Sequence, residues 1–219
     1  MFGRFRQKSL VSLAKPFSIQ ELRKRTKIVV IDDDKDAFPV QALQDEGYTI
    51  EYWQEVQSVD RLERGDFDII VLDIAGVAQK FSPDEDGFGV LQHVKWHNPA
   101  QIIVAFSGQS FDLSKQEFFK LADDTMPKPV TTLKCKQVLD ELIESKMTVR
   151  HLWKTIVILM RAEGVPEKRI NQLETQVSKA LGAGRRPDIK RIVSDAVERS
   201  ELAAKVVGVM VKIVGLCGL

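Results

Sequence analysis

The feature that most constrains the fold is the stretch 28–34, in which four β-branched residues precede three consecutive aspartates. A short, continuous β-branched run is typical of a strand buried on both faces, as in a parallel sheet. Such a strand brings Asp32, Asp33 and Asp34 to its carboxyl end. Crowded carboxylates repel one another, and a hard divalent cation with oxygen ligands, typically Mg²⁺, is the usual compensation. The alternative is a polar turn, with Asp36 capping the next helix.

Composition limits the domain organisation and the compartment. A chain of 219 residues with 44% hydrophobic content can fill one sizeable core and a smaller second one. Cys135 and Cys217 match no metal-ligand spacing and lie too far apart in sequence for a disulfide to be assumed. No long apolar run of the signal-peptide kind precedes residue 28. We therefore expect a reduced, cytoplasmic protein.

Charge is segregated along the chain, although the net charge is only +1. Residues 1–27 carry a net +7, residues 28–145 a net −13, and residues 146–219 a net +7. The two basic regions could fold back on the acidic middle, or bind an acidic partner, a membrane surface or nucleic acid. The alternative interpretation is that these charges lie on solvated helix faces.

From residue 27 to 145 apolar runs alternate with helical patterns, which is typical of βαβ units and a parallel sheet. Ser18 and Glu21 also predict a capping box for a short preceding helix. Strands are predicted at 27–32, 48–53, 67–72, 101–106 and 124–127. Helices are predicted between and after them at 36–46, 58–64, 87–97, 112–121 (capped by Asp112) and 131–145 (capped by Thr131 or Thr132). The predicted fold is a flavodoxin-like, five-stranded, doubly wound sheet with its sites at the carboxyl ends of the strands.

Polar side chains follow the other predicted strands as well. Asp73 follows the third strand, Ser107 the fourth and Lys128 the fifth. Taken singly, these would be a helix cap, a turn residue and a solvated lysine. Because the carboxyl ends of parallel strands meet at one edge, the set together predicts a site.

At these positions the chain resembles a response-regulator receiver domain, the CheY-like module of two-component signalling. The resemblance covers about residues 27–145. The matching segments are 31–34, 71–74, 86–91, 105–108 and 122–129.

The resemblance implies a phosphoacceptor site. Asp73 would take a phosphoryl group from a histidine kinase or a histidine phosphotransfer protein. Lys128 and the Ser107 hydroxyl would contact phosphoryl oxygens. Mg²⁺ would be bound by a separate set of groups. These are Asp32 (through water), Asp33, Asp73 and the backbone carbonyl of Ala75.

The resemblance also implies a switch, with some departures. Phosphorylation would shift the face formed by 112–121, 124–127 and 131–145. Thr125 stands where the family often has a switching aromatic residue, and the insert 79–85 could cover the site or bind a partner. Ala75 and Gln109 stand where the family tunes access of hydrolytic water, and since alanine cannot orient water we predict a slowly decaying phosphoform.

Beyond residue 145 the resemblance ends and apolar stripes at helical spacing continue, near 149–160, 170–181, 187–196 and 202–219. The last stretch contains Lys205 and Lys212, which make it a poor transmembrane span. Packing within a helical region or across a dimer is the leading interpretation, and an interfacial membrane helix the lesser one. No helix-turn-helix or enzymatic output motif is evident, although basic pairs at 185–186 and 190–191 leave nucleic-acid contact open.

The sequence therefore predicts three regions: a basic, partly helical arm (1–26), a receiver domain (27–145) and a helical output or homo-oligomerisation domain (146–219). The predicted function is that of a cytoplasmic response regulator, not an enzyme beyond the phosphorylation and dephosphorylation of its own Asp73. One alternative is a receiver-like scaffold that is never phosphorylated. Another is an aspartate-nucleophile phosphotransferase or phosphatase, although such phosphatases usually have a second aspartate where this chain has Ala75.

Overall fold

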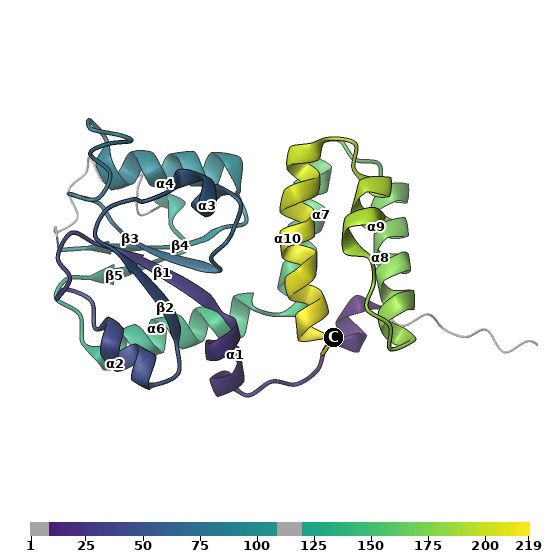
Figure 1. Cartoon of the computed structure of the whole chain (residues 1–219), viewed down its shortest axis with the longest axis horizontal. Coiled ribbons are helices and arrows are strands. Elements are labelled where there is room, and N and C mark those ends of the chain that lie inside the picture. The colour runs from purple at the N-terminus through teal and green to yellow at the C-terminus, as the bar shows by residue number, and fades with distance from the viewer. Residues whose placement is uncertain (1–8, 109–119) are drawn as a thin grey trace, which may run out of the picture. The chain divides into compact units, whose positions relative to one another are not determined.

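The computed structural model describes residues 9–108 and 120–219, which form two compact units (Figure 1). One unit contains Ser18–Glu144, and the other contains residues 9–17 together with Ser145–Leu219. The predicted arm 1–26 is thus divided between the two units, apart from residues 1–8, which lie outside the described part of the chain. The difference arises because Ser18 starts a helix that packs in the sheet unit, whereas Leu10 is buried in the helical unit.

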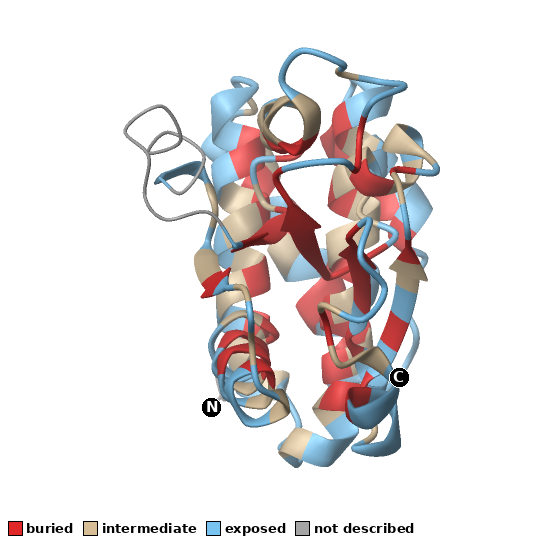
Figure 2. Cartoon of the chain, turned by 90° about the vertical axis from the view of Figure 1, so that its left-hand side faces the viewer, coloured by how far each residue is buried: buried red, intermediate tan, exposed pale blue. Residues whose placement is uncertain are grey.

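The sheet unit is built on five parallel strands in the order β2-β1-β3-β4-β5. All residues of β3 and β4 are buried, as expected for strands covered on both faces. Figure 2 shows this burial along the strands. The strand bounds are β1 Lys27–Ile31, β2 Thr49–Trp53, β3 Ile69–Asp73, β4 Ile102–Ser107 and β5 Asp124–Pro127. This topology confirms the flavodoxin-like prediction.

Helices cover both faces of the sheet, with α3 and α4 on one face and α2 and α6 on the other (Figure 1). On the first face, Leu62 of α3 and Val90 and Val94 of α4 share one buried cluster with Val29 and Ile31 of β1. The helices of this unit are α1 Ile19–Arg25, α2 Val40–Asp45, α3 Val59–Glu63, α4 Asp86–His97 and α6 Thr132–Lys146. Alternate residues of a strand face opposite sides, so a buried strand must be apolar throughout.

Most predicted boundaries agree with the structure. Ser18 and Glu21 form the predicted capping box, and Gly47 and Gly65 follow α2 and α3 with positive φ. The Thr131 hydroxyl oxygen accepts a hydrogen bond from the Lys134 backbone at 3.2 Å, confirming Thr131 as a cap.

The prediction of a helix from residue 36 was wrong at its start. The helix begins at Val40, because the residue before Pro39 is disfavoured in the helical region. Asp36 therefore caps no helix; its backbone amide donates to the Asp34 carboxylate. The helix predicted at 112–121, with its Asp112 cap, lies outside the described residues up to position 119.

The helical unit contains a short 3₁₀ helix, η1, and four α-helices that carry the predicted apolar stripes. η1 contacts α7 and α8, and α10 packs against α7 and α9. The Lys15 amide donates to the Leu216 carbonyl at 3.0 Å, which joins the two ends of this unit. The bounds are η1 Leu10–Leu13, α7 Val149–Ala162, α8 Glu167–Gly182, α9 Ile189–Ala196 and α10 Ser200–Leu216. Among the described helices, none combines the length and apolar character required to cross a bilayer.

Candidate functional site at the carboxyl edge of the sheet

The carboxyl end of β1 delivers two aspartates with different exposure. Asp32 is fully buried and Asp33 is exposed. The Asp32 amide donates to the Trp53 carbonyl at 3.1 Å, continuing the pairing of β1 with β2, and the Asp34 amide donates to Asp32 Oδ1 at 2.9 Å. The backbone thus holds Asp32 in one orientation, while Asp33 stays open to solvent.

Asp73 is the last residue of β3 and is buried. Its Oδ1 accepts a hydrogen bond from the Ile74 amide at 2.6 Å. β3 lies between β1 and β4, so the Asp73 side chain emerges beside the end of β1. The strand order therefore brings together carboxylates that are forty residues apart in sequence.

Lys128 follows β5 directly and crosses to the acidic residues. Its Nζ lies 2.7 Å from Asp32 Oδ2 and 2.6 Å from Asp73 Oδ2. The same ammonium lies 4.9 Å from the centroid of the Phe106 ring, a favourable cation–π geometry. Lys128 thus joins β5 to β1 and β3 across the carboxyl edge.

Ser107 ends β4 and is buried. It pairs with Pro127 in the sheet register, while Phe106, one residue earlier, pairs with Asp73. The Lys128 amide donates to the Ser107 carbonyl at 3.0 Å. The backbone of Ser107 is therefore next to that of Lys128, and the register places it one residue beyond the level of Asp73.

Ala75 is an exposed residue of the loop that follows β3, and its neighbour Gly76 touches the site. A Cβ added at Gly76, which has a φ of +80°, would overlap the Asp33 carboxylate. Only glycine therefore combines this backbone conformation with this close approach. The sequence analysis missed Gly76, since a single glycine in a loop carries no distinctive signal.

The start of α4 holds this loop in place. The Asp86 carboxylate accepts hydrogen bonds from the amides of Gly76, Val77 (3.0 Å) and Ala78 (2.7 Å). A Cβ at Gly87 would overlap the Asp73 carbonyl oxygen, so α4 can begin directly against the end of β3 only with glycine there. Asp86 and Gly87 belong to a recognised segment of the sequence, but their contacts with the loop were not predicted.

The electrostatics of the site are those of a crowded acidic pocket. Burial raises the pKa of Asp32, and the neighbouring Lys128 ammonium opposes that rise only in part. Burial alone would lower the pKa of Lys128, but its ion pairs with Asp32 and Asp73 outweigh burial and raise it. Burial together with the nearby aspartates raises the pKa of Tyr52 to about 12. The site therefore keeps Lys128 and Tyr52 protonated at neutral pH.

The acidic residues fit a hard divalent cation. Asp32, Asp33 and Asp73 each offer an oxygen, and these oxygens lie within 4.8 Å of one another. Within the described residues, the Lys128 ammonium pairs with two of these three carboxylates, those of Asp32 and Asp73. Carboxylate oxygens and excess negative charge suit Mg²⁺, which binds through a few carboxylates and retains waters.

The chain is similar to several solved structures, although it matches no family model and no curated protein. Among solved structures, a CheY-like response regulator receiver domain protein from Methanospirillum hungatei JF-1 is 22% identical, covering 55% of this chain and 94% of its own, with a TM-score of 0.47. The chemotaxis protein CheY4 of Vibrio cholerae is 20% identical, covering 53% of this chain and 97% of its own, with a TM-score of 0.44.

A longer protein shows the same degree of similarity. NtrX from Brucella abortus is 22% identical, covering 71% of this chain and 34% of its own, with a TM-score of 0.47. At these identities the fold assignment rests on the strand order and register seen in the chain itself. Residues 18–144 thus have a flavodoxin-like fold, by the order and direction of their strands.

Proposed function

We propose that this chain is a two-component response regulator that accepts a phosphoryl group on Asp73 from a phosphohistidine of a histidine kinase or phosphotransfer protein. The observation that carries the proposal is the position of Asp73. Its carboxylate ends a central strand, contacts Lys128 at 2.6 Å and clusters with Asp32 and Asp33. These contacts would bring a nucleophile, a cation for phosphoryl oxygens and ligands for a metal together.

In the proposed transfer, an oxygen of Asp73 forms a bond to phosphorus while the phosphorus–nitrogen bond of the donor breaks. The imidazole leaves and takes up a proton. A carboxylate is a weak nucleophile, so the reaction needs a reactive donor and neutralisation of the transferring charge. Mg²⁺ held by Asp33, Asp73 and the Ala75 carbonyl, and through water by Asp32, would supply much of that neutralisation. Lys128 and the Ser107 hydroxyl would bind phosphoryl oxygens.

The same contacts suggest how the signal would leave the site. Lys128 now pairs with Asp32 and Asp73, and phosphorylation would offer it the added oxygens instead. Because the Lys128 amide is bonded to the Ser107 carbonyl, a shift of either residue moves the ends of β4 and β5. β5 is followed along the chain by α6, after residues 128–131, so the proposed output face includes β5 and α6.

The proposal is tested by incubating the full chain with Mg²⁺ and a small acyl-phosphate donor and measuring the intact mass. We expect the mass of one added phosphoryl group, stable in acid and labile in base, and its complete loss in Asp73→Asn. Asp68→Asn is the matched control. Asp68 is buried just before the same strand, at the opposite edge, where its carboxylate accepts from the Lys27 amide at 2.7 Å, and asparagine keeps that acceptor.

The other outcomes distinguish the alternatives. Turnover of phosphate esters by the isolated protein would favour an aspartate-nucleophile phosphotransferase or phosphatase. No adduct and no response to Mg²⁺ would favour a receiver-shaped scaffold. An adduct that is lost within seconds would contradict the slow decay that we propose from Ala75.

For the helical unit we propose homo-oligomerisation that responds to phosphorylation. Ile158 of α7 and Val211 of α10 are about half exposed, at 52% and 48%. Solution mass of the full chain with and without the phosphoryl group would test this. Truncation near residue 146 would be a poor test, because it removes the helices that η1 packs against. Leu10 of η1, which is buried in that unit, would then be exposed. Contacts with nucleic acid or a membrane surface, and the cytoplasmic location, stay predictions.

A further inference from the structure

We propose that Glu63, His93 and His97 form a second metal site, for a transition-metal ion such as Zn²⁺, on the face of the sheet unit covered by α3 and α4. Each residue offers one ligand atom, and these atoms lie within 4.8 Å of one another. Two imidazoles and one carboxylate suit zinc rather than magnesium. The site is separate from the acidic pocket and does not depend on the proposed phosphorylation.

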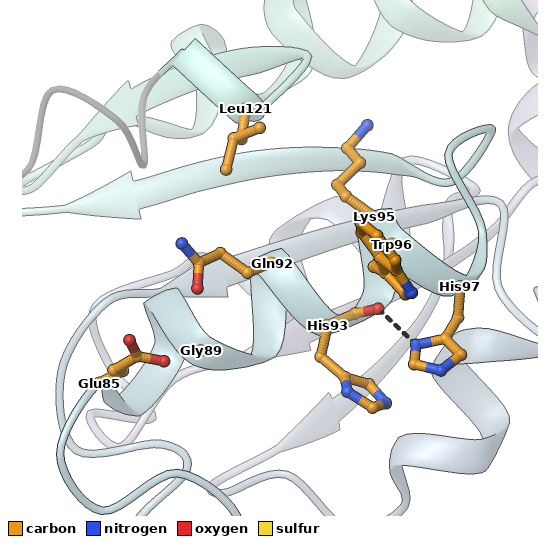
Figure 3. Close-up of a pocket in the computed structure, with 8 residues that line it drawn as sticks. All are labelled: Glu85, Gly89, Gln92, His93, Lys95, Trp96, His97 and Leu121. Carbon is orange, nitrogen blue, oxygen red and sulfur yellow. Dashed lines mark hydrogen bonds between the residues drawn. The ribbon is translucent and has the colours of Figure 1, made fainter.

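The two histidines lie one helical turn apart on α4 (Figure 3). Residues four apart share a helix face, and here the ring centroids are 4.1 Å apart with an interplanar angle of 36°. Glu63, the last residue of α3, reaches the same place, with its Oε1 2.6 Å from His93 Nε2. Ligands thus come from two helices that are otherwise joined by apolar packing.

The hydrogen bonding of His97 prepares it as a ligand. Its Nδ1 lies 2.9 Å from the backbone carbonyl of His93, shown as the dashed line in Figure 3. A carbonyl oxygen only accepts, so Nδ1 must carry the hydrogen, and in the neutral ring the lone pair is on Nε2. Metal-bound histidines usually have such a partner on the other ring nitrogen, which sets the tautomer and the ring orientation.

The simpler interpretation is an ordinary ion pair between Glu63 and His93. An ion pair explains the 2.6 Å contact between Glu63 Oε1 and His93 Nε2. It does not explain why the His97 ring lies beside this pair with its Nδ1 on a backbone carbonyl. Metal binding would replace the hydrogen bond between Glu63 and His93, and a neutral His93 ring would then carry its hydrogen on Nδ1. The His93 side chain is 45% exposed and that of Glu63 27% exposed, so an ion can enter and a water can complete a four-coordinate site. His97 also ends α4, where the helix dipole favours a cation.

The test is a calorimetric titration of the untagged full chain with Zn²⁺, in excess Mg²⁺ so that the acidic pocket is occupied. We expect one ion per chain and a melting temperature that rises by several degrees. His97→Ala should weaken binding by more than about tenfold while leaving the Glu63–His93 pair intact. His151→Ala, which changes the third histidine of the chain, on α7, should bind like the wild type.

Co²⁺ provides a second readout. A visible absorption spectrum typical of four-coordinate cobalt, without a thiolate charge-transfer band, would support the site and exclude the cysteines. Should His97→Ala misfold, His97→Gln replaces it, because glutamine is a neutral side chain without an imidazole ligand. Unchanged affinity in the His97 variants, loss of binding in Asp33→Asn, or no Zn²⁺ binding by the wild type would each overturn the proposal.

Discussion

The sheet unit carries two clusters of charged side chains at opposite edges, and they are balanced in opposite ways. At the carboxyl edge, the acidic pocket sets Asp32, Asp33 and Asp73 against Lys128. At the amino edge, a cluster that we call the Arg23 network joins α1, the loop before β2 and α6. Its members are Arg23, Glu46, Tyr48, Lys136 and Asp140.

In the Arg23 network every charge has a partner. The buried Arg23 donates from Nε to Asp140 Oδ1 at 2.8 Å, and the Tyr48 hydroxyl donates to the same carboxylate. Lys136 pairs with Glu46, so two cations face two anions. Burial alone would raise the pKa of Asp140, but the hydrogen bonds from Arg23 and Tyr48 outweigh it and hold this pKa below its ordinary value.

The difference in charge balance indicates a different role for each cluster. A buried pair with its hydrogen bonds satisfied holds elements in register, and its loss leaves an uncompensated charge. The acidic pocket instead keeps excess negative charge and a buried Asp32 whose pKa is raised, a state that favours any cation able to enter. Strain of this kind is typical of functional sites, whereas the Arg23 network contributes stability.

The largest expected effect is at the Arg23 network. Asp140→Asn removes the closer of the two carboxylates that pair with the buried Arg23 guanidinium and should lower the free energy of unfolding by about 3 kcal/mol, measured by urea denaturation at neutral pH. The depressed pKa of Asp140 stabilises the fold above the unfolded-state pKa of about 4. That contribution is lost as the pH falls through the folded pKa, so the difference between variant and wild type should shrink below about pH 4.

Glu144→Gln, an exposed residue one turn further along α6, is the matched control and should change little. At a temperature where Asp140→Asn is folded, its Asp73 should still accept a phosphoryl group. Loss of that reactivity would contradict the comparison, because it would show that the Arg23 network also affects the acidic pocket at the other edge.

An intermediate effect, of opposite sign, is expected at the acidic pocket. Asp33→Asn removes one of the three repelling carboxylates, so without metal it should raise the free energy of unfolding by roughly 1 kcal/mol. It should also abolish the rise in melting temperature that we expect Mg²⁺ to give the wild type. Asp34→Asn is the control, since Asp34 is exposed and outside the ligand set. A destabilised Asp33→Asn protein would show that the pocket is not under electrostatic strain.

The smallest effect is expected at the rim of the Arg23 network. Lys136 and Glu46 are paired, but their side chains are 32% and 48% exposed. Exposed pairs contribute little to stability, so Lys136→Ala should lower the free energy of unfolding far less than Asp140→Asn does, and less still at high salt. A cost comparable to that of Asp140→Asn would mean that the network acts as one unit, including its exposed members.

The strands and the acidic pocket were predictable because their signals are local. A buried strand must be apolar at every position, as 28–31 and 69–72 are, and parallel strands must end at one edge. The start of α2 was mispredicted although Pro39 was visible, because the helical periodicity was followed through it. The partners of Arg23 lie up to 117 residues away, and no local pattern indicates such a pairing.

The amino-acid order alone was sufficient for the sheet, its carboxyl edge and the aspartates and lysine that meet there, because alternation, run length and caps are properties of neighbouring residues. Three features needed the folded chain: the assignment of residues 9–17 to the helical unit, the close approach of Gly76 to Asp33, and the meeting of Glu63 with His93 and His97. Each depends on which surfaces pack together, and packing is decided by shape and burial between segments distant in sequence.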